Sequence, residues 1–319
     1  MEQPKITIGI TSYNSADTIG AAISSALEQT YSDFEILIVD DKSQENSLEI
    51  IRKTIEDRPS IRLIAHEENK GVAASRNTII NHANGDLIAF FDDDDISDPL
   101  RLQKQLSRIL SYEENQGETL TICHSARLQK YPDGKTRIAP TMGCSTSKIA
   151  PHGEDMAAHI LYNKTIHSGD HGSLATCSQM ARTSTYKTLG GFDETFKRME
   201  DTEFNVRLAL AGGHFLGIDE ALVTQTMTLA NDKNIEMERV YAIKLYEKHQ
   251  DFLDKCRRGN FDKNWTHLKH DYWENKTWDF LRRLFSLGIK HPILSMERLL
   301  AALPNAGYNK NIRKLHSDI

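Results

Sequence analysis

The chain has 319 residues, of which 39% are hydrophobic and 26% charged, and its formal net charge is −6. This composition excludes a disordered chain and indicates one large globular domain or two ordinary ones. The acidic balance argues against a protein that coats nucleic acid. The charge is uneven, because residues 263–319 hold ten basic and five acidic residues and the remainder holds 29 basic and 40 acidic ones. We therefore expect two parts with different roles.

Cysteine usage and the N-terminus bear on the compartment. Four scattered cysteines form no Cys-x-x-Cys pair, so reduced thiols are the simpler interpretation than a disulfide framework or a zinc site. The start, MEQPKITIGI, lacks the basic and apolar regions of a signal peptide. No run approaches the ~18 apolar residues that span a bilayer. We expect a cytoplasmic protein, and peripheral contact with the inner face of the membrane remains open.

The first part of the chain alternates strands and helices. Apolar, β-rich segments predict strands, and segments with apolar residues at helical spacing predict helices between them. Asp17 and Asp98 are candidate caps of the helices that follow them. Such repetition implies a parallel sheet with helices on both faces, that is, an α/β fold. The expected strands are 5–14, 34–41, 61–66 and 86–93, and the expected helices follow Asp17, span 46–57 and 72–84, and follow Asp98.

The pattern changes at about residue 119. Strands are expected at 119–126 and 173–181 and as one or two strands within 214–228, with a turn at 131–135. A short helix ends at the glycine pair 190–191, a longer one covers 201–213, and the chain beyond about 232 is helical.

Polar residues collect where three of the expected parallel strands end. They are Thr11 to Asn14, Asp40 with Asp41, and Asp92 to Asp95. Parallel sheets bind ligands at the carboxyl ends of their strands. Core packing gives no reason for these polar clusters, whereas a ligand site at this edge explains them.

The four consecutive aspartates suggest a cation. On a continuing strand Asp92 and Asp94 would point to one face, and Asp93 and Asp95 to the other. Paired carboxylates are the hard oxygen ligands that Mg²⁺ or Mn²⁺ prefers, often together with substrate phosphates. The plainer alternative is an acidic loop that caps the next helix, a role that Asp98 already fills.

Three blocks of the sequence resemble family 2 glycosyltransferases of the GT-A fold. They are ITIGITSYNSADTIGAAISSALEQTYSDFEILIVDDKSQENS, ENKGVAASRNTIINHANGDLIAFFDDDDISDP and TLGGFDETFKRMEDTEFNVRLALAG, and they cover roughly the first 215 residues in the family's order. The resemblance implies a catalytic domain over 1–230, with a nucleotide-binding half (1–118) and an acceptor-binding half (119–230). A helical C-terminal extension would follow at 231–319.

The resemblance also implies roles for individual residues. Asp201 matches the catalytic base, and Arg76 matches a basic residue near the nucleotide. Asp92 and Asp94 match the DxD pair, in which the first residue reaches the ribose and the second the metal. Asp93 is the alternative for the ribose. The implied nucleotide-binding residues are Thr11, Ser12, Tyr13, Asn14, Asp40, Asp41, Arg76, Asp92 and Asp93, and the implied metal ligands are Asp94 and Asp92.

The implied chemistry is metal-dependent, inverting transfer of a sugar from a nucleotide sugar, by resemblance a UDP-sugar, to a hydroxyl. A hexosyl- or N-acetylhexosaminyltransferase in bacterial surface polysaccharide or lipid-linked oligosaccharide assembly is the expected setting. Mn²⁺ or Mg²⁺ would stabilise the leaving diphosphate, and Asp201 would accept the acceptor's proton. Many relatives carry a metal-reaching histidine after the last core strand, and TQTMTLANDKN has none. Asp201 also has a structural alternative as a first-turn acid that stabilises its helix.

Two further regions are less specific. The loop HSGDHGS is a candidate acceptor site or an ordinary exposed loop; the candidate acceptor residues are His167, Asp170, His171 and Glu200. The tail 263–319 is basic and aromatic. It is expected either to rest on an anionic membrane that carries a lipid-linked acceptor, or to pack on the catalytic domain or a second subunit of a homo-oligomer.

Other functions fit the sequence less well. A nucleotidyltransferase would need a glycine-rich, basic phosphate loop after the first strand, which TSYNSADTIG lacks. A non-catalytic nucleotide-sugar binding module would keep the aspartates without needing Asp201. A glycoside hydrolase needs two carboxylates ~5–10 Å apart on opposite sides of a bond, which neighbouring strand residues do not supply.

Overall fold

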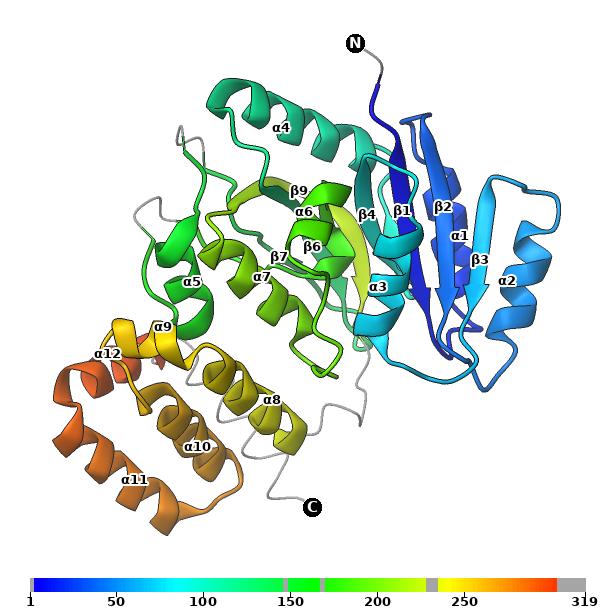
Figure 1. Cartoon of the computed structure of the whole chain (residues 1–319). Helices are drawn as coiled ribbons and strands as arrows, with labels where there is room; N and C mark the ends of the chain where they lie inside the picture. The colour runs from blue at the N-terminus through cyan, green and yellow to red at the C-terminus, as the bar shows by residue number, and fades with distance from the viewer. Residues whose placement is uncertain (1–2, 146–148, 167–169, 228–234, 303–319) are drawn as a thin grey trace. The chain divides into compact units, whose positions relative to one another are not determined.

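The computed structural model describes residues 3–145, 149–166, 170–227 and 235–302. The chain divides into two compact units, residues 1–229 and 230–319, which are drawn in Figure 1 and described separately below. No helix within the described ranges is both long and apolar enough to cross a bilayer.

Unit 1 begins with parallel strands joined by helices. The strands are apolar and buried along most of their length, as expected of a sheet covered on both faces. In Figure 1 they lie side by side in the order β3-β2-β1-β4. The elements are β1 (Ile6–Ser12), α1 (Ile19–Leu27), β2 (Phe34–Asp40), α2 (Ser47–Ile55), β3 (Ile61–Ala65), α3 (Val72–His82) and β4 (Leu87–Asp92).

The remainder of unit 1 extends the same sheet. Beyond β4 the order continues β8-β6-β9-β5, with β7 paired to β6, which makes a nine-stranded sheet in the part of the chain that is described. Of the new pairings only β6 with β9 is parallel. The elements are β5 (Asp95–Ser97), α4 (Arg101–Gln116), β6 (Thr121–Lys130), β7 (Thr136–Ala139), α5 (Gly153–Tyr162), η1 (Thr176–Ser178), β8 (Gln179–Arg182), α6 (Thr183–Thr188), α7 (Glu200–Leu210) and β9 (His214–Thr226).

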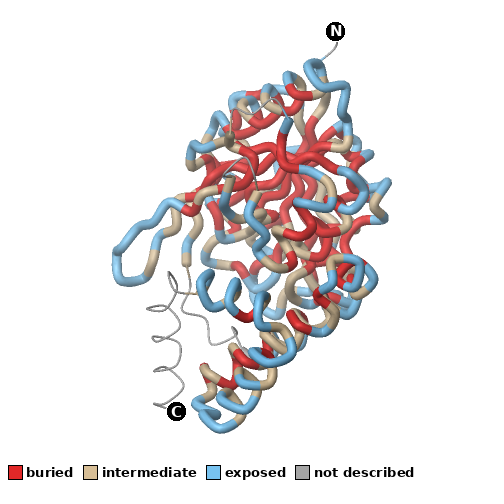
Figure 2. The backbone as a smooth tube through the Cα atoms, turned by 90° about the vertical axis from the view of Figure 1, so that its left-hand side faces the viewer, coloured by how far each residue is buried: buried red, intermediate tan, exposed pale blue. Residues whose placement is uncertain are grey.

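The alternation of side chains on β1 shows which helices cover which face of the sheet. Ile6, Ile8 and Ile10 form one core cluster with residues of α1 and α4. Gly9 points to the other face, where a Cβ would lie 2.5 Å from Ile79 of α3. The sheet is therefore the buried centre of unit 1, as the red tube in Figure 2 shows.

Three local expectations were wrong. The segment predicted as a strand over 173–181 is a 3-10 turn followed by the short strand β8. Asp17 does not cap α1, whose N-cap is Thr18 without a side-chain hydrogen bond. The helix after Asp98 begins only at Arg101, because the Asp98 carboxylate accepts the N–H of Leu100 in a turn that precedes the helix.

Unit 2 is helical in its described residues. Its small core is formed by Phe261, Leu268 and Leu287, with partly buried neighbours around them. The helices are α8 (Ile235–Lys248), α9 (Gln250–Lys255), α10 (Phe261–Trp273), α11 (Thr277–Lys290) and α12 (Pro292–Ala302).

Gly85 offers a stability test of the entry into β4. Its N–H donates to the Thr7 hydroxyl at 2.9 Å, and its carbonyl accepts from the Thr183 hydroxyl at 2.6 Å. A Cβ would lie 2.5 Å from the backbone nitrogen of Thr7, which has no room to move. We expect Gly85→Ala to lower the free energy of unfolding by about 2 kcal/mol in urea denaturation.

Gly20→Ala is the matched control. Nothing lies within 4 Å of a Cβ at this helical position. It should leave stability unchanged or raise it by up to about 1 kcal/mol. Equal losses in the two variants would contradict the close packing inferred at Gly85.

Candidate active site

The ends of β1 and β4 are joined through the backbone of Tyr13. Its N–H donates to the Asp93 carboxylate at 2.9 Å, and its ring is exposed. Thr11 pairs with Val39 on one side and Asp92 on the other, so it lies between the second and third predicted clusters. Tyr13 and Thr11 thus lie at the same sheet edge as the aspartates.

Ser12 and Asn14 shape the loop that follows β1. The Ser12 hydroxyl lies 2.9 Å from that of Ser15. Asn14 has a positive φ of 52°, its N–H donates to the Ser43 hydroxyl, and its side-chain oxygen accepts from the N–H of Gln44. Asn14 therefore holds the loops after β1 and β2 together, and Ser12 stabilises the loop after β1.

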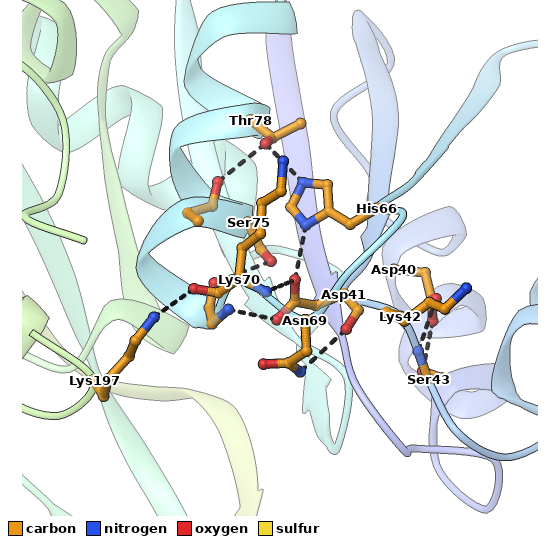
Figure 3. Close-up of polar contacts among 12 residues, drawn as sticks. Asp40, Asp41, Lys42, Ser43, His66, Asn69, Lys70, Ser75, Thr78 and Lys197 are labelled. Carbon is orange, nitrogen blue, oxygen red and sulfur yellow. Dashed lines mark hydrogen bonds and ion pairs between the residues drawn. The ribbon is translucent and has the colours of Figure 1, made fainter. Parts of the chain in front are cut away.

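Asp40 and Asp41 are both buried, and Figure 3 shows their hydrogen bonds. Asp40 accepts from the N–H and the hydroxyl of Ser43. Asp41 accepts from the backbone N–H groups of Lys70 and Gly71 and lies 2.7 Å from the Nδ1 of His66. The Asp41 carboxylate therefore fixes the loop that leads into α3.

The four aspartates do not alternate as predicted. β4 ends at Asp92, a turn holds Asp93 and Asp94, and β5 begins at Asp95. The chain reverses direction here, so Asp92 groups with Asp95 rather than sharing a strand face with Asp94. One ligand atom each of Asp92, Asp95 and Cys177 lie within 4.8 Å of one another.

Burial perturbs three of these carboxyl groups. Desolvation raises the pKa of Asp93 to about 7, against the lowering effect of the Tyr13 N–H. Desolvation, with the neighbouring charge of Asp92, also raises the pKa of Asp95 to about 7 and that of Asp94 above its ordinary value. Neither oxygen of Asp95 accepts a hydrogen bond of normal geometry from the described residues, although the nearby Cys177 thiol lowers the pKa of this carboxyl group. The row therefore holds negative charge that the protein solvates incompletely.

Arg76 bridges the two halves of unit 1. It is buried, it donates to Glu200 at 2.6 Å, and its second terminal nitrogen lies 3.7 Å from Asp92. Desolvation lowers its pKa, but the carboxylates of Glu200 and Asp92 outweigh this and raise it. This guanidinium therefore ties the end of β4 to the first residue of α7.

Two further buried arginines lie near the aspartates. Arg101 donates to Ser97 and to the carbonyl of Phe90, and burial lowers its pKa to about 10. Arg127 donates to neutral partners, Gln225 and Ser173, at 2.7 Å each. In the described part of the chain neither guanidinium lies within 4.0 Å of a carboxylate. Both charges act on the pKa values of the surrounding groups, and Arg127 lowers that of Asp95.

Asp201 lines a cavity of about 390 Å³ between α5, α7 and β6. The negative charge of Asp201 also helps to raise the pKa of Arg76, the guanidinium that pairs with Asp92. The wall's other polar residues come from four separate segments, and sequence reasoning singled out only the loop HSGDHGS, which contains Ser173. These polar residues are Arg127, His159, Asn163, Ser173, Thr202 and Asn205.

The predicted acceptor residues that the structure describes lie outside the lining of this cavity. His167 lies outside the described residues, as do positions 228–234 of the segment that lacks the metal-reaching histidine. Asp170 accepts from the N–H of Ser145, and His171 is exposed. Glu200 pairs with Arg76, which gives it a structural contact that the prediction did not contain. None of Asp170, His171 and Glu200 lines the cavity, although the adjacent residues 172–175 do.

Solved structures share this architecture. Staphylococcus aureus TarS 1–349 in complex with UDP-GlcNAc matches with a TM-score of 0.60 and 18% identity, over 98% of this chain and 90% of that one. The mannosyltransferase PcManGT of Pyrobaculum calidifontis, in complex with GDP-Man and Mn²⁺, matches with a TM-score of 0.56 and 15% identity, over 99% and 84%. The predicted GT-A fold with C-terminal helices is confirmed.

Sequence comparison gives the family. The profile described as Glycosyl transferase family 2 matches residues 7–138. The Escherichia coli enzyme UDP-Glc:alpha-D-GlcNAc-diphosphoundecaprenol beta-1,3-glucosyltransferase WfgD is 40% identical over 110 residues, which are 34% of this chain and 43% of that protein. The putative glycosyltransferase EpsE of Bacillus subtilis is 30% identical over 226 residues, 69% of this chain and 72% of that one. The chain therefore belongs to glycosyltransferase family 2.

Proposed function

We propose that this protein transfers a sugar from a UDP-sugar to an acceptor hydroxyl with inversion at the anomeric carbon. The observation that carries the proposal is the position of Asp201. Its carboxylate lines the cavity, and its charge acts on the same guanidinium that pairs with Asp92 at the sheet edge. A base in a cavity next to an anion-rich edge suits attack by a hydroxyl on a donor held at that edge.

The nucleotide is proposed as UDP. Support comes from the name of the E. coli relative and from the UDP and UDP-GlcNAc complexes of TarS, whereas PcManGT was solved with GDP-Man. The donor would lie along the ends of β1, β2 and β4. Thr11, Tyr13 and Asp41 would contact the base and ribose, and Asp92 or Asp93 the ribose. Donor sugars of the hexose or N-acetylhexosamine class fit these relatives.

The aspartate row suits a divalent cation. Its donor groups are carboxylate oxygens, which Mg²⁺ and Mn²⁺ prefer. The buried, unpartnered oxygens of Asp95 lie beside Asp92, as a site built for added positive charge requires. Asp92 and Asp94 would hold the metal as the motif implies, and Asp95 would join them, since its ligand atom lies within 4.8 Å of that of Asp92. When bound, the ion would stabilise the charge that builds up on the leaving diphosphate.

The protein's own groups would then act on the acceptor. The acceptor oxygen forms a bond to the anomeric carbon as the bond to the diphosphate breaks, and the nucleotide diphosphate leaves with the electron pair. Asp201 takes the proton of the attacking hydroxyl. A single displacement from the opposite face inverts the configuration and needs no covalent sugar–enzyme intermediate.

The acceptor is proposed to be carried on a lipid diphosphate, in assembly of a surface polysaccharide or a lipid-linked oligosaccharide. The E. coli relative is named for a diphosphoundecaprenol acceptor, which supports this class. Such an acceptor lies at a membrane surface, so we also propose peripheral membrane contact. The cavity around Asp201 would receive its terminal sugar, because its wall offers hydrogen-bonding groups from Arg127, Ser173 and Asn205.

Asp201→Asn tests the base. The substitution keeps the shape of the side chain but removes the proton acceptor, so the rate of UDP release should fall by about 10³-fold. The assay supplies UDP-sugars with water or GlcNAc-diphosphoundecaprenol as acceptor. The donor-induced rise in melting temperature should persist, because the donor site is intact.

The exposed residue Asp57 provides the control, and Asp57→Asn should leave both readouts unchanged. UDP release by Asp201→Asn within about twofold of the wild-type rate would remove the base assignment. Donor binding without UDP release by the wild-type protein would instead favour a non-catalytic binding module.

The stability of the metal-free protein should depend on pH through the aspartate row. The pKa of Asp95 is about 7 in the folded protein against an ordinary value of 3.8, so the folded state binds the extra proton between these values. The protonated Asp95 carboxyl group therefore contributes to the free energy of unfolding at low pH, and this contribution is lost as pH rises through 7. Mn²⁺ binds the ionised form, so it should raise the melting temperature more at pH 8 than at pH 6.

Differential scanning fluorimetry at the two pH values, with and without Mn²⁺, measures this effect. In Asp95→Asn the Mn²⁺-induced rise in melting temperature should differ less between pH 6 and pH 8 than in the wild-type protein. In Asp57→Asn the difference should be the same as in the wild type. A Mn²⁺-induced shift of equal size at both pH values in the wild-type protein would contradict this account of the site.

A further inference from the structure

Helix α11 is apolar on two faces. Phe280, Leu284 and Leu287 pack into the core of unit 2. A second stripe faces outward at helical spacing, and its large side chains stay exposed: Trp278 (85%), Leu281 (48%), Phe285 (72%) and Ile289 (65%). A surface helix normally has one apolar face, and an apolar second face indicates that something else covers it.

The next helix repeats the arrangement. α11 and α12 pack against each other. On α12, Leu294 packs toward the core and Ser295 is buried, whereas Ile293, Met296 and Leu300 are exposed at a spacing of three and four residues. Two consecutive helices therefore expose apolar stripes. We call this set of side chains the outer apolar face: Trp278, Leu281, Phe285, Ile289, Ile293, Met296, Leu299 and Leu300.

This face differs from the basic aromatic face predicted for the tail. Trp265 and Phe280 pack around the small core, and Trp273 is buried. The exposed stripe keeps only Trp278 and Phe285 of the predicted aromatics and adds aliphatic residues. The sequence pattern missed it, because both faces of α11 are apolar and only packing distinguishes them.

Positive charge accompanies the outer apolar face. Residues 276–290 hold four basic residues and one acid. The Arg282 side chain is 79% exposed, is next to the stripe on the helical wheel and forms a surface ion pair with Asp279 at 3.1 Å, and Lys290 is exposed. Arg283 pairs with Asp271, whose side chain is buried, at 2.8 Å and belongs to the interior of unit 2. Residues 230–319 together hold 17 basic and 12 acidic residues.

We propose that the outer apolar face of α11 and α12 docks unit 2 on an anionic lipid bilayer. Exposed apolar side chains flanked by Lys and Arg, with Trp at one end, are what an interfacial helix presents to acyl chains and acidic headgroups. The excess of basic residues favours a negatively charged surface over a second, equally charged copy of this unit. The inference deepens the proposed lipid-linked acceptor, because it names the surface that would bring the enzyme to it.

Vesicle co-sedimentation of the full-length protein tests the proposal. The wild-type protein should sediment with vesicles of equal parts phosphatidylcholine and phosphatidylglycerol, and much less with phosphatidylcholine alone. The triple variant Trp278→Ser, Phe285→Ser, Ile289→Ser should lower the partition coefficient by at least about tenfold, since each side chain loses its burial in the membrane. Arg282→Glu with Lys290→Glu should weaken binding in a salt-dependent manner.

Ile138→Ser is the matched control. Ile138 is 60% exposed in unit 1, and its substitution should leave vesicle binding unchanged. The triple variant should keep the wild-type melting temperature, because the substituted side chains lie outside the core. Arg282→Glu with Lys290→Glu keeps the apolar stripe and so tests the charge even if the triple variant fails to fold.

Three outcomes would overturn the proposal. In the first, the wild-type protein binds neither kind of vesicle. In the second, Ile138→Ser lowers vesicle binding as much as the triple variant does. In the third, light scattering shows a wild-type dimer and a monomeric triple variant, and the wild-type protein binds no vesicle. The donor-induced shift in melting temperature, measured without vesicles, separates this surface from the proposed transfer reaction. If the wild-type protein binds vesicles but its melting temperature does not rise with the donor, the proposed transfer reaction is rejected and the proposed membrane surface stands.

Discussion

The buried guanidinium of Arg76 is the contact on which the geometry of unit 1 depends. It joins Asp92, at the end of a parallel strand, to Glu200, which lies 124 residues further along the chain than Arg76. A buried charge is tolerated only when it is paired, so both carboxylates hold the arginine in place. Because Asp201 follows Glu200 directly, the same contact fixes the candidate base relative to the aspartate row. Residues from the parallel part of the sheet and from α7 are thereby held in one candidate site.

Buried arginines offset the aspartate row only in part. The positive charges of Arg101 and Arg127 act on the pKa values of nearby groups, but both side chains donate to neutral groups. The raised pKa values of Asp93 and Asp95 are the physical sign of what is left uncompensated. A fully compensated row would have no need of a further cation, whereas this one retains carboxylate oxygens that are buried and unpaired. The electrostatics of the row thus support the proposal that a divalent cation binds here together with the donor diphosphate.

The division of charge along the chain agrees with a division of labour. Residues 1–229 carry the acidic sheet edge, and an anionic membrane would repel them. Residues 230–319 carry the basic excess and the outer apolar face of α11 and α12. An enzyme that uses an anionic donor and reaches an acceptor at a membrane needs both properties. Because the acidic sheet edge and the basic, apolar face lie in separate units, neither reduces the charge of the other.

The sequence by itself determined the fold class, the order of elements and the polar edge of the sheet, because strand and helix periodicity and strand ends are local properties. It also named Arg76 and Asp201, through motifs that resemble the family. Tertiary structure alone decided that Asp92 groups with Asp95 and Cys177, since a chain reversal replaces the expected alternation. It alone assembled the cavity around Asp201 from four segments and told the inner face of α11 from the outer one. These features depend on which distant residues meet, and no local pattern records that.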